Sequence, residues 1–155
     1  MARLLSLAPL AAALLLSACA APPISRPSMS YVAPEITASD AKLLAADSVA
    51  YLADPLPPAK TTVLLDPPSS TDHDTLTAPM LDALRARGYG VTVVDPKTGT
   101  ATGEGVPLRY LATPALNGVV LRLQFQSIEA ASFYPRSADG KLVPNGTPIT
   151  VRGEK

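Results

Sequence analysis

The clearest pattern in the chain is an alternation of apolar and polar side chains over residues 119–126, interrupted only by Val120. The apolar positions are Val119, Leu121, Leu123 and Phe125, and the polar positions between them are Arg122, Gln124 and Gln126. A two-residue period is typical of a β-strand with one face on a core and the other toward water. We therefore expect a sheet that is covered on one side only.

Two segments have helical spacing instead. The first opens at Thr37, where Asp40 completes a capping box, carries an apolar face, and ends before Asp54–Pro55. We expect this face to pack against the core; binding a partner is the alternative. The second helix is expected over residues 77–87, with Thr77 as its cap and Gly88 as its stop. A start near Asp72 is the alternative, and Pro79 would then kink the helix.

Shorter runs predict the remaining strands, and glycine-containing pairs predict the turns between them. Strands are expected at residues 61–66, 89–95, 108–113, 131–136, 142–143 and 149–151. Turns are expected at Asn117–Gly118 and Asp139–Gly140, and an exposed loop over 97–105. The fold class that follows is α+β: a small, mainly antiparallel sheet with one or two packed helices, preceded by a disordered tether. Ile149–Val151 is expected to close the sheet as an exposed edge strand.

The amino-terminal segment has a different pattern. Arg3 is followed by an apolar run from Leu4 to Leu16, which is too short to span a bilayer and typical of a secretory signal. The run ends in Leu-Ser-Ala-Cys, which resembles a bacterial lipobox. That resemblance implies cleavage before Cys19, a diacylglycerol thioether on its sulfur, and an acylated amine. An ordinary signal peptide with a chance cysteine is the alternative.

These features predict three regions: a lipoprotein signal peptide at 1–18, a lipidated, proline-rich tether at 19–35, and one globular domain at 36–155. Two or more acyl chains would hold the protein stably on a membrane. Ala20 follows Cys19 where, by the enteric sorting rule, an aspartate would retain a lipoprotein at the inner membrane. The expected location is therefore the cell envelope, on the outer membrane and facing the periplasm.

Charge and composition exclude several classes of function. Thirteen basic and thirteen acidic side chains balance to a formal charge of zero, so direct nucleic-acid binding is not expected. His73 is the only histidine, and Asp72-His73-Asp74 is better explained by a helix N-terminus than by a metal site. The glycines of 99–105 fit neither a P-loop nor a dinucleotide-binding fingerprint. We expect no enzyme activity, no catalytic residue, no metal and no cofactor.

A binding role remains, and one cluster suits it. Phe133, Tyr134 and Arg136 combine aromatic and guanidinium groups that are common at protein interfaces. An additional strand with Phe133 buried explains them equally well. Thr150, on the expected edge strand, is the further contact candidate, because an edge can accept a partner's strand.

The lipobox, the proline-rich tether and five further segments resemble the TrbH conjugal transfer lipoproteins. The segments are residues 43–52, 57–66, 81–89 and 139–144, followed by Thr150-Val151-Arg152. The resemblance implies a structural part of a mating-pair formation apparatus, a type IV secretion system that carries plasmid DNA, with partners among its proteins and no catalytic residues. The alternative is a stand-alone envelope lipoprotein that binds a small ligand or a cell-wall polymer. Neighbouring transfer genes would favour the first interpretation.

Overall fold

A computed structural model describes residues 29–70, 72–144 and 148–152. The predicted signal peptide, Cys19 and the first part of the predicted tether lie outside these residues. The elements, in chain order, are β1 (Tyr31–Val32), α1 (Ala38–Leu52), the 3-10 turn η1 (Pro58–Lys60), β2 (Thr62–Leu65), α2 (Thr77–Arg87), β3 (Gly90–Val93), β4 (Val106–Ala115), β5 (Gly118–Phe125), β6 (Ile128–Pro135) and β7 (Ile149–Arg152).

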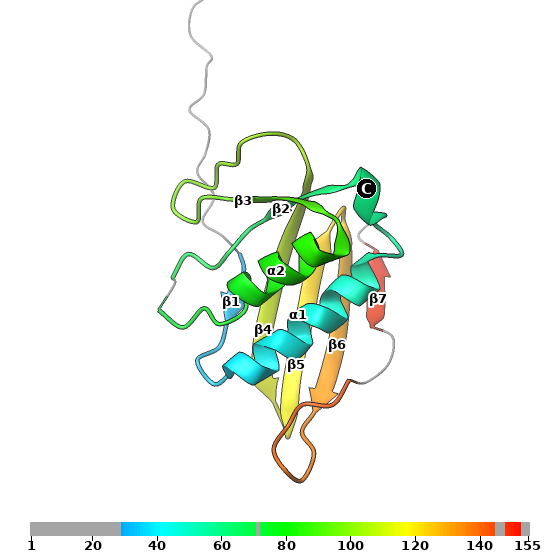
Figure 1. The fold of residues 1–155 in the computed structure, drawn as a ribbon. Helices are drawn as coiled ribbons and strands as arrows, with labels where there is room; N and C mark the ends of the chain where they lie inside the picture. The colour runs from blue at the N-terminus through cyan, green and yellow to red at the C-terminus, as the bar shows by residue number, and fades with distance from the viewer. Residues whose placement is uncertain (1–28, 71, 145–147, 153–155) are drawn as a thin grey trace, which may run out of the picture.

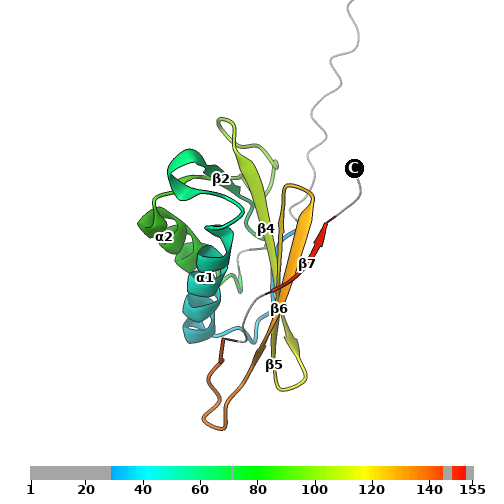
Figure 2. The same cartoon turned by 90° about the vertical axis from the view of Figure 1, so that its right-hand side faces the viewer.

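The strands form one mixed sheet in the order β3-β2-β4-β5-β6-β7, and β1 pairs with β4 (Figure 1). Neighbours from β4 to β7 are antiparallel, whereas β2 is parallel to both β3 and β4. Both helices lie on the same side of the sheet (Figure 2). The predicted α+β class with a mainly antiparallel sheet is confirmed, and so is the position of β7 at an edge.

Helix α1 begins as its sequence predicts. The Thr37 side chain accepts the backbone N–H of Asp40, and the Asp40 carboxylate accepts the N–H of Thr37, so the capping box is complete. Its predicted apolar face is buried, with Leu44 and Leu52 fully enclosed. The helix therefore packs on the core and does not present this face to a partner.

Helix α2 has the predicted bounds but a different cap. Thr77 is its first helical residue, and Asp74 instead accepts the backbone N–H groups of Leu76 and Thr77, at 3.2 and 3.0 Å. A carboxylate suits this position because it meets both the unpaired N–H groups and the positive end of the helix dipole. Gly88 ends the helix at a φ of 94°, as its place after Arg87 predicts.

Strands β4, β5 and β6 form a meander that is longer than expected. β4 extends two residues beyond each predicted end, and its turn falls on Leu116–Asn117, one residue before the predicted pair. The next turn, at Gln126–Ser127, was not predicted because it contains no glycine; both residues have positive φ, 47° and 63°. That conformation matches the twist of the flanking strands and allows β6 to begin directly at Ile128.

The expected hairpin around Asp139–Gly140 is reduced to a single bridge between Arg136 and Leu142. Residues 29–34, expected to belong to the tether, are part of the fold. Tyr31 and Val32 pair with Leu111 and Ala112 of β4. The sequence did not predict this strand, because the segment around it is rich in proline and two residues are too few to show an alternation of apolar and polar side chains.

Candidate functional site

One face of the sheet is covered by helices and the other is not, and we call the second the open face. Along β4, the side chains of Leu108, Tyr110 and Ala112 are fully buried beneath the helices. The side chains between them point the opposite way and remain partly exposed. By strand pairing, the open face comprises Arg109, Leu111 and Thr113 of β4, Val120, Arg122 and Gln124 of β5, Glu129, Ala131 and Phe133 of β6, and Ile149 and Val151 of β7.

A polar cluster occupies the open face at the end near the Gln126–Ser127 turn. Arg122 donates to Glu129 Oε1 through Nε at 2.9 Å and through Nη2 at 2.6 Å. Gln124 donates to the other carboxylate oxygen at 3.1 Å. The hydrogen bond from Arg122, followed by that from Gln124, lowers the pKa of Glu129. This end of the open face therefore carries one positive and one negative side chain, whose charges cancel.

Beside this cluster lies an open hollow of about 660 Å³. Its walls are formed by Pro107, Arg109, Gln124, Phe125, Gln126, Ser127, Ile128, Glu129 and Val151. Arg109 donates through Nε to Asp66 at 3.0 Å, which fixes the guanidinium at the rim. The hollow runs across the sheet to Val151, so it is continuous with the β7 edge.

Strand β7 is the most exposed apolar part of the open face. Ile149 is 76% exposed and Val151 is 61% exposed. Thr150, between them, points to the helix side, where its hydroxyl lies 3.1 Å from the Tyr51 hydroxyl. The sequence predicted Thr150 as a contact, but the side chains that present apolar surface are its two neighbours. The alternation of Ile149 and Val151 with Thr150 could have shown that these two share the opposite face.

The predicted cluster of Phe133, Tyr134 and Arg136 is divided by the sheet. Phe133 lies on the open face, where its ring covers Gly118: a β-carbon at that glycine would come within 2.8 Å of the ring. Tyr134 is 2% exposed on the covered face and donates to Asp47 at 2.5 Å. Burial, together with Asp47, raises the pKa of Tyr134. Tyr134, not Phe133, is therefore the buried aromatic, and it has no surface to offer a partner.

Arg136 joins β6 to the start of α1. Its two terminal nitrogens donate to the two oxygens of Asp40, at 3.0 and 2.8 Å, and one of them also donates to the Gly140 carbonyl at 2.8 Å. Burial acts to raise the pKa of Asp40, but the bonds from Arg136 and Thr37 outweigh it and lower that pKa overall. Asp40 is almost wholly enclosed, so the pair acts as a structural clamp.

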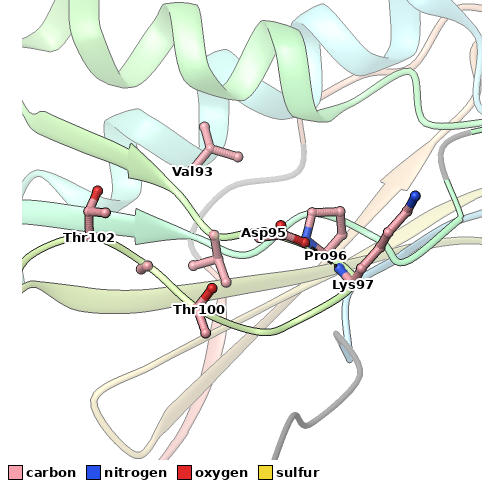
Figure 3. A pocket seen from close by; sticks show the side chains of 8 residues that line it. Val93, Asp95, Pro96, Lys97, Thr100 and Thr102 are labelled. Carbon is pink, nitrogen blue, oxygen red and sulfur yellow. Dashed lines mark hydrogen bonds between the residues drawn. The ribbon is translucent and has the colours of Figure 1, made fainter.

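A second hollow, of about 640 Å³, lies beside β3 (Figure 3). It is lined by Val93, Val94, Asp95, Pro96, Lys97, Thr100, Ala101 and Thr102. The Asp95 carboxylate accepts the backbone N–H groups of Lys97 and Thr98, which lowers its pKa and shapes the loop. A smaller hollow of about 170 Å³ is lined in part by His73, which is exposed, and by Asp74, which is partly buried.

Within the residues that the structure describes, no three His, Cys, Asp or Glu side chains gather as metal ligands would. In the same part of the chain, no helix is long and apolar enough to cross a membrane.

A family profile described as "Conjugal transfer protein TrbH" matches residues 25–154. The chain belongs to the TrbH family. The match includes every described strand and both helices of the domain. The description of TrbH names a role in conjugal transfer and no enzymatic activity. No match was found among curated proteins or among solved structures.

Proposed function

We propose that the protein is a lipid-anchored assembly component of a conjugative type IV secretion system, held at the outer membrane and facing the periplasm. The TrbH match over residues 25–154 is the observation that carries this proposal. In this role the domain binds other proteins of the mating-pair formation apparatus and supports plasmid DNA transfer without turning over a substrate.

The test is transfer of the plasmid that encodes the protein. Deletion of the gene is expected to lower transfer frequency, and an intact copy supplied in trans is expected to restore it. A deletion strain that transfers its plasmid at the parental rate would contradict the proposal. Binding of a small ligand or a cell-wall polymer would then become the better hypothesis.

The anchor is proposed to be Cys19, the only cysteine in the chain. Labelled palmitate supplied to expressing cells should enter the wild-type protein and be absent from Cys19→Ser. Fractionation should find the wild-type protein in the outer membrane and the variant outside it. Equal labelling of the two forms would contradict lipidation at this residue.

Assembly is proposed to use the free edge of β7, whether the strand that pairs with it comes from another protein or from a second copy. In the described residues β7 pairs only with β6, so its other edge has unpaired backbone donors and acceptors that suit strand addition. Phe133 and Arg136, from the predicted contact group, are less suitable, because the Phe133 ring packs over Gly118 and the Arg136 guanidinium is bonded to Asp40.

Proline substitution tests the edge. The backbone N–H groups of Thr150 and Val151 point to opposite sides of the strand. Of the two variants Thr150→Pro and Val151→Pro, one therefore removes an N–H that points outward from the sheet edge, and the other removes an N–H that points toward β6. The variant that removes the outward donor should lower transfer while the protein stays abundant in the membrane fraction. Parental transfer by both variants would exclude docking at β7.

A further inference from the structure

We propose that the partner of the β7 edge is a second copy of this chain, paired antiparallel with the first about a two-fold axis at Thr150. This inference rests on the proposed use of the β7 edge and identifies its occupant. It follows from the pattern of β7 itself, from its exposure, and from a register that sets no like charges directly opposite each other.

The side chains of β7 form a palindromic pattern. Ile149 and Val151 are both β-branched, lie on the same face, and flank Thr150 on the other face. In an antiparallel pair, directly opposite residues share a face. With Thr150 opposite its own copy, Ile149 lies opposite Val151 of the other chain, and Val151 lies opposite its Ile149. One two-fold operation therefore matches apolar to apolar twice and threonine to threonine once.

The proposed pairing would bury apolar side chains that are exposed in the single chain. Ile149 and Val151 are among the most exposed large apolar side chains of the described residues, at 76% and 61%. Pairing about Thr150 would bring four such side chains together on the open face. β-Branched cross-strand neighbours and opposed threonines are both favourable pairs in sheets.

Nothing in Ile149–Val151 guards the edge against pairing. Native sheets protect free edges with proline, charge or a bulge. Here a proline and a charge stand only at the two flanks, Pro148 and Arg152, and pairing about Thr150 sets Pro148 of one copy opposite Arg152 of the other. The sheet would continue through both copies, with the helices of each on the same side as Thr150.

Charge does not oppose the contact. The chain has thirteen basic and thirteen acidic side chains, so two copies do not repel each other through net charge. Arg152, the one charged residue of β7, lies opposite Pro148 in this register and not opposite its own copy. On the open face, Arg122 and Glu129 are paired with each other. If both copies are anchored to one membrane, confinement further raises their effective concentration.

A cysteine at position 150 tests the pairing in the full-length protein. Opposite Cα atoms in an antiparallel pair lie about 4.5–5.5 Å apart, within the range that a disulfide spans. Oxidation of membranes that contain Thr150→Cys should therefore give a disulfide-linked dimer. Thr102→Cys is the matched control, because Thr102 is also exposed but lies in the loop after β3. The wild-type chain, with Cys19 as its only cysteine, gives the background.

Register is tested by co-expressing Ile149→Cys and Val151→Cys with different epitope tags. The mixed dimer is expected to exceed either variant's dimer with itself, because positions 149 and 151 face each other across the axis. A Thr150→Cys dimer no stronger than the Thr102→Cys control would overturn the inference. Preferential cross-linking of Ile149→Cys to itself would overturn the proposed register.

The cross-link and the transfer assay fail independently. A strong Thr150→Cys dimer with parental transfer by both proline variants would support self-pairing and contradict the proposed function of the edge. Loss of transfer in a proline variant, with no dimer above background, would instead assign the edge to a different protein.

Discussion

The two faces of the β4–β5–β6 meander hold their charged groups in different ways. On the covered side, the side chain of Asp40 in α1 is 3% exposed, and both of its carboxylate oxygens are paired with Arg136. On the open face, Arg122 and Glu129 make an equally close contact but remain 45% and 35% exposed. The same chemistry therefore has two consequences: a buried carboxylate requires its partner, whereas water can replace the partner of an exposed one.

Apolar side chains follow the same division. Leu108 and Leu111 lie three residues apart on β4, yet Leu108 is fully buried and Leu111 is only partly so. We therefore expect substitutions on the covered face to cost more stability than substitutions on the open face. The open face and the adjacent β7 edge are therefore available for binding.

The largest expected effect is from Leu108→Ala. Removing a fully buried leucine side chain leaves a cavity and should lower the free energy of unfolding by about 2–5 kcal/mol. Leu111→Ala, the same change on the other face of the same strand, should cost about 1 kcal/mol. Urea unfolding of the two purified variants measures both. Equal losses would mean that the open face is covered by something that the fold does not show.

The next effect separates the two ion pairs. Arg136→Leu leaves Asp40 enclosed without its partner and should cost about 2 kcal/mol, less than a wholly buried pair because Arg136 is 25% exposed. Arg122→Leu on the open face should cost about 0.2–1 kcal/mol. Chemical denaturation of both variants measures the difference between these two losses of stability. Equal losses would mean that Asp40 finds another hydrogen-bond donor when Arg136 is removed.

A smaller effect should appear on acidification. The pKa of Asp40 is below its ordinary value of 3.8 in the folded protein. Its contribution to stability is therefore complete above the unfolded pKa and disappears as the pH falls through the folded pKa. Unfolding measured between pH 6 and pH 2 should show a steeper acid loss for the wild type than for Asp40→Asn. Parallel curves would assign the acid loss to other carboxylates.

The sequence predicted those features of the fold that depend on residues close together in the chain. The capping box of α1, the bounds of α2, the alternation in β5 and the edge position of β7 could all be recognised from consecutive residues. The Gln126–Ser127 turn could not, because its positive φ angles are imposed by strand twist and not by glycine. The short β1 strand was likewise stabilised by a distant partner, β4, which no local pattern identifies.

The site was predicted less completely for the same reason. Residues 133–136 have the composition of an interface, but the phase of β6 decides which side chains reach solvent. That phase is set by pairing with β5, where Val119 lies opposite Tyr134 and brings it under the helices. The exposure of Ile149 and Val151 depends equally on the neighbour of β7, so only the central Thr150 was selected.

The central claim is that the β7 edge of the open face supports conjugal transfer. Its most direct test is the plasmid transfer frequency of the double variant Ile149→Lys/Val151→Lys, because lysine protects an edge against pairing. The matched control is Leu116→Lys/Val143→Lys, which changes two other exposed apolar side chains. With equal protein abundance, we predict transfer near the level of the deletion strain for the β7 variant and near the parental level for the control. Parental transfer by the β7 variant would contradict the claim.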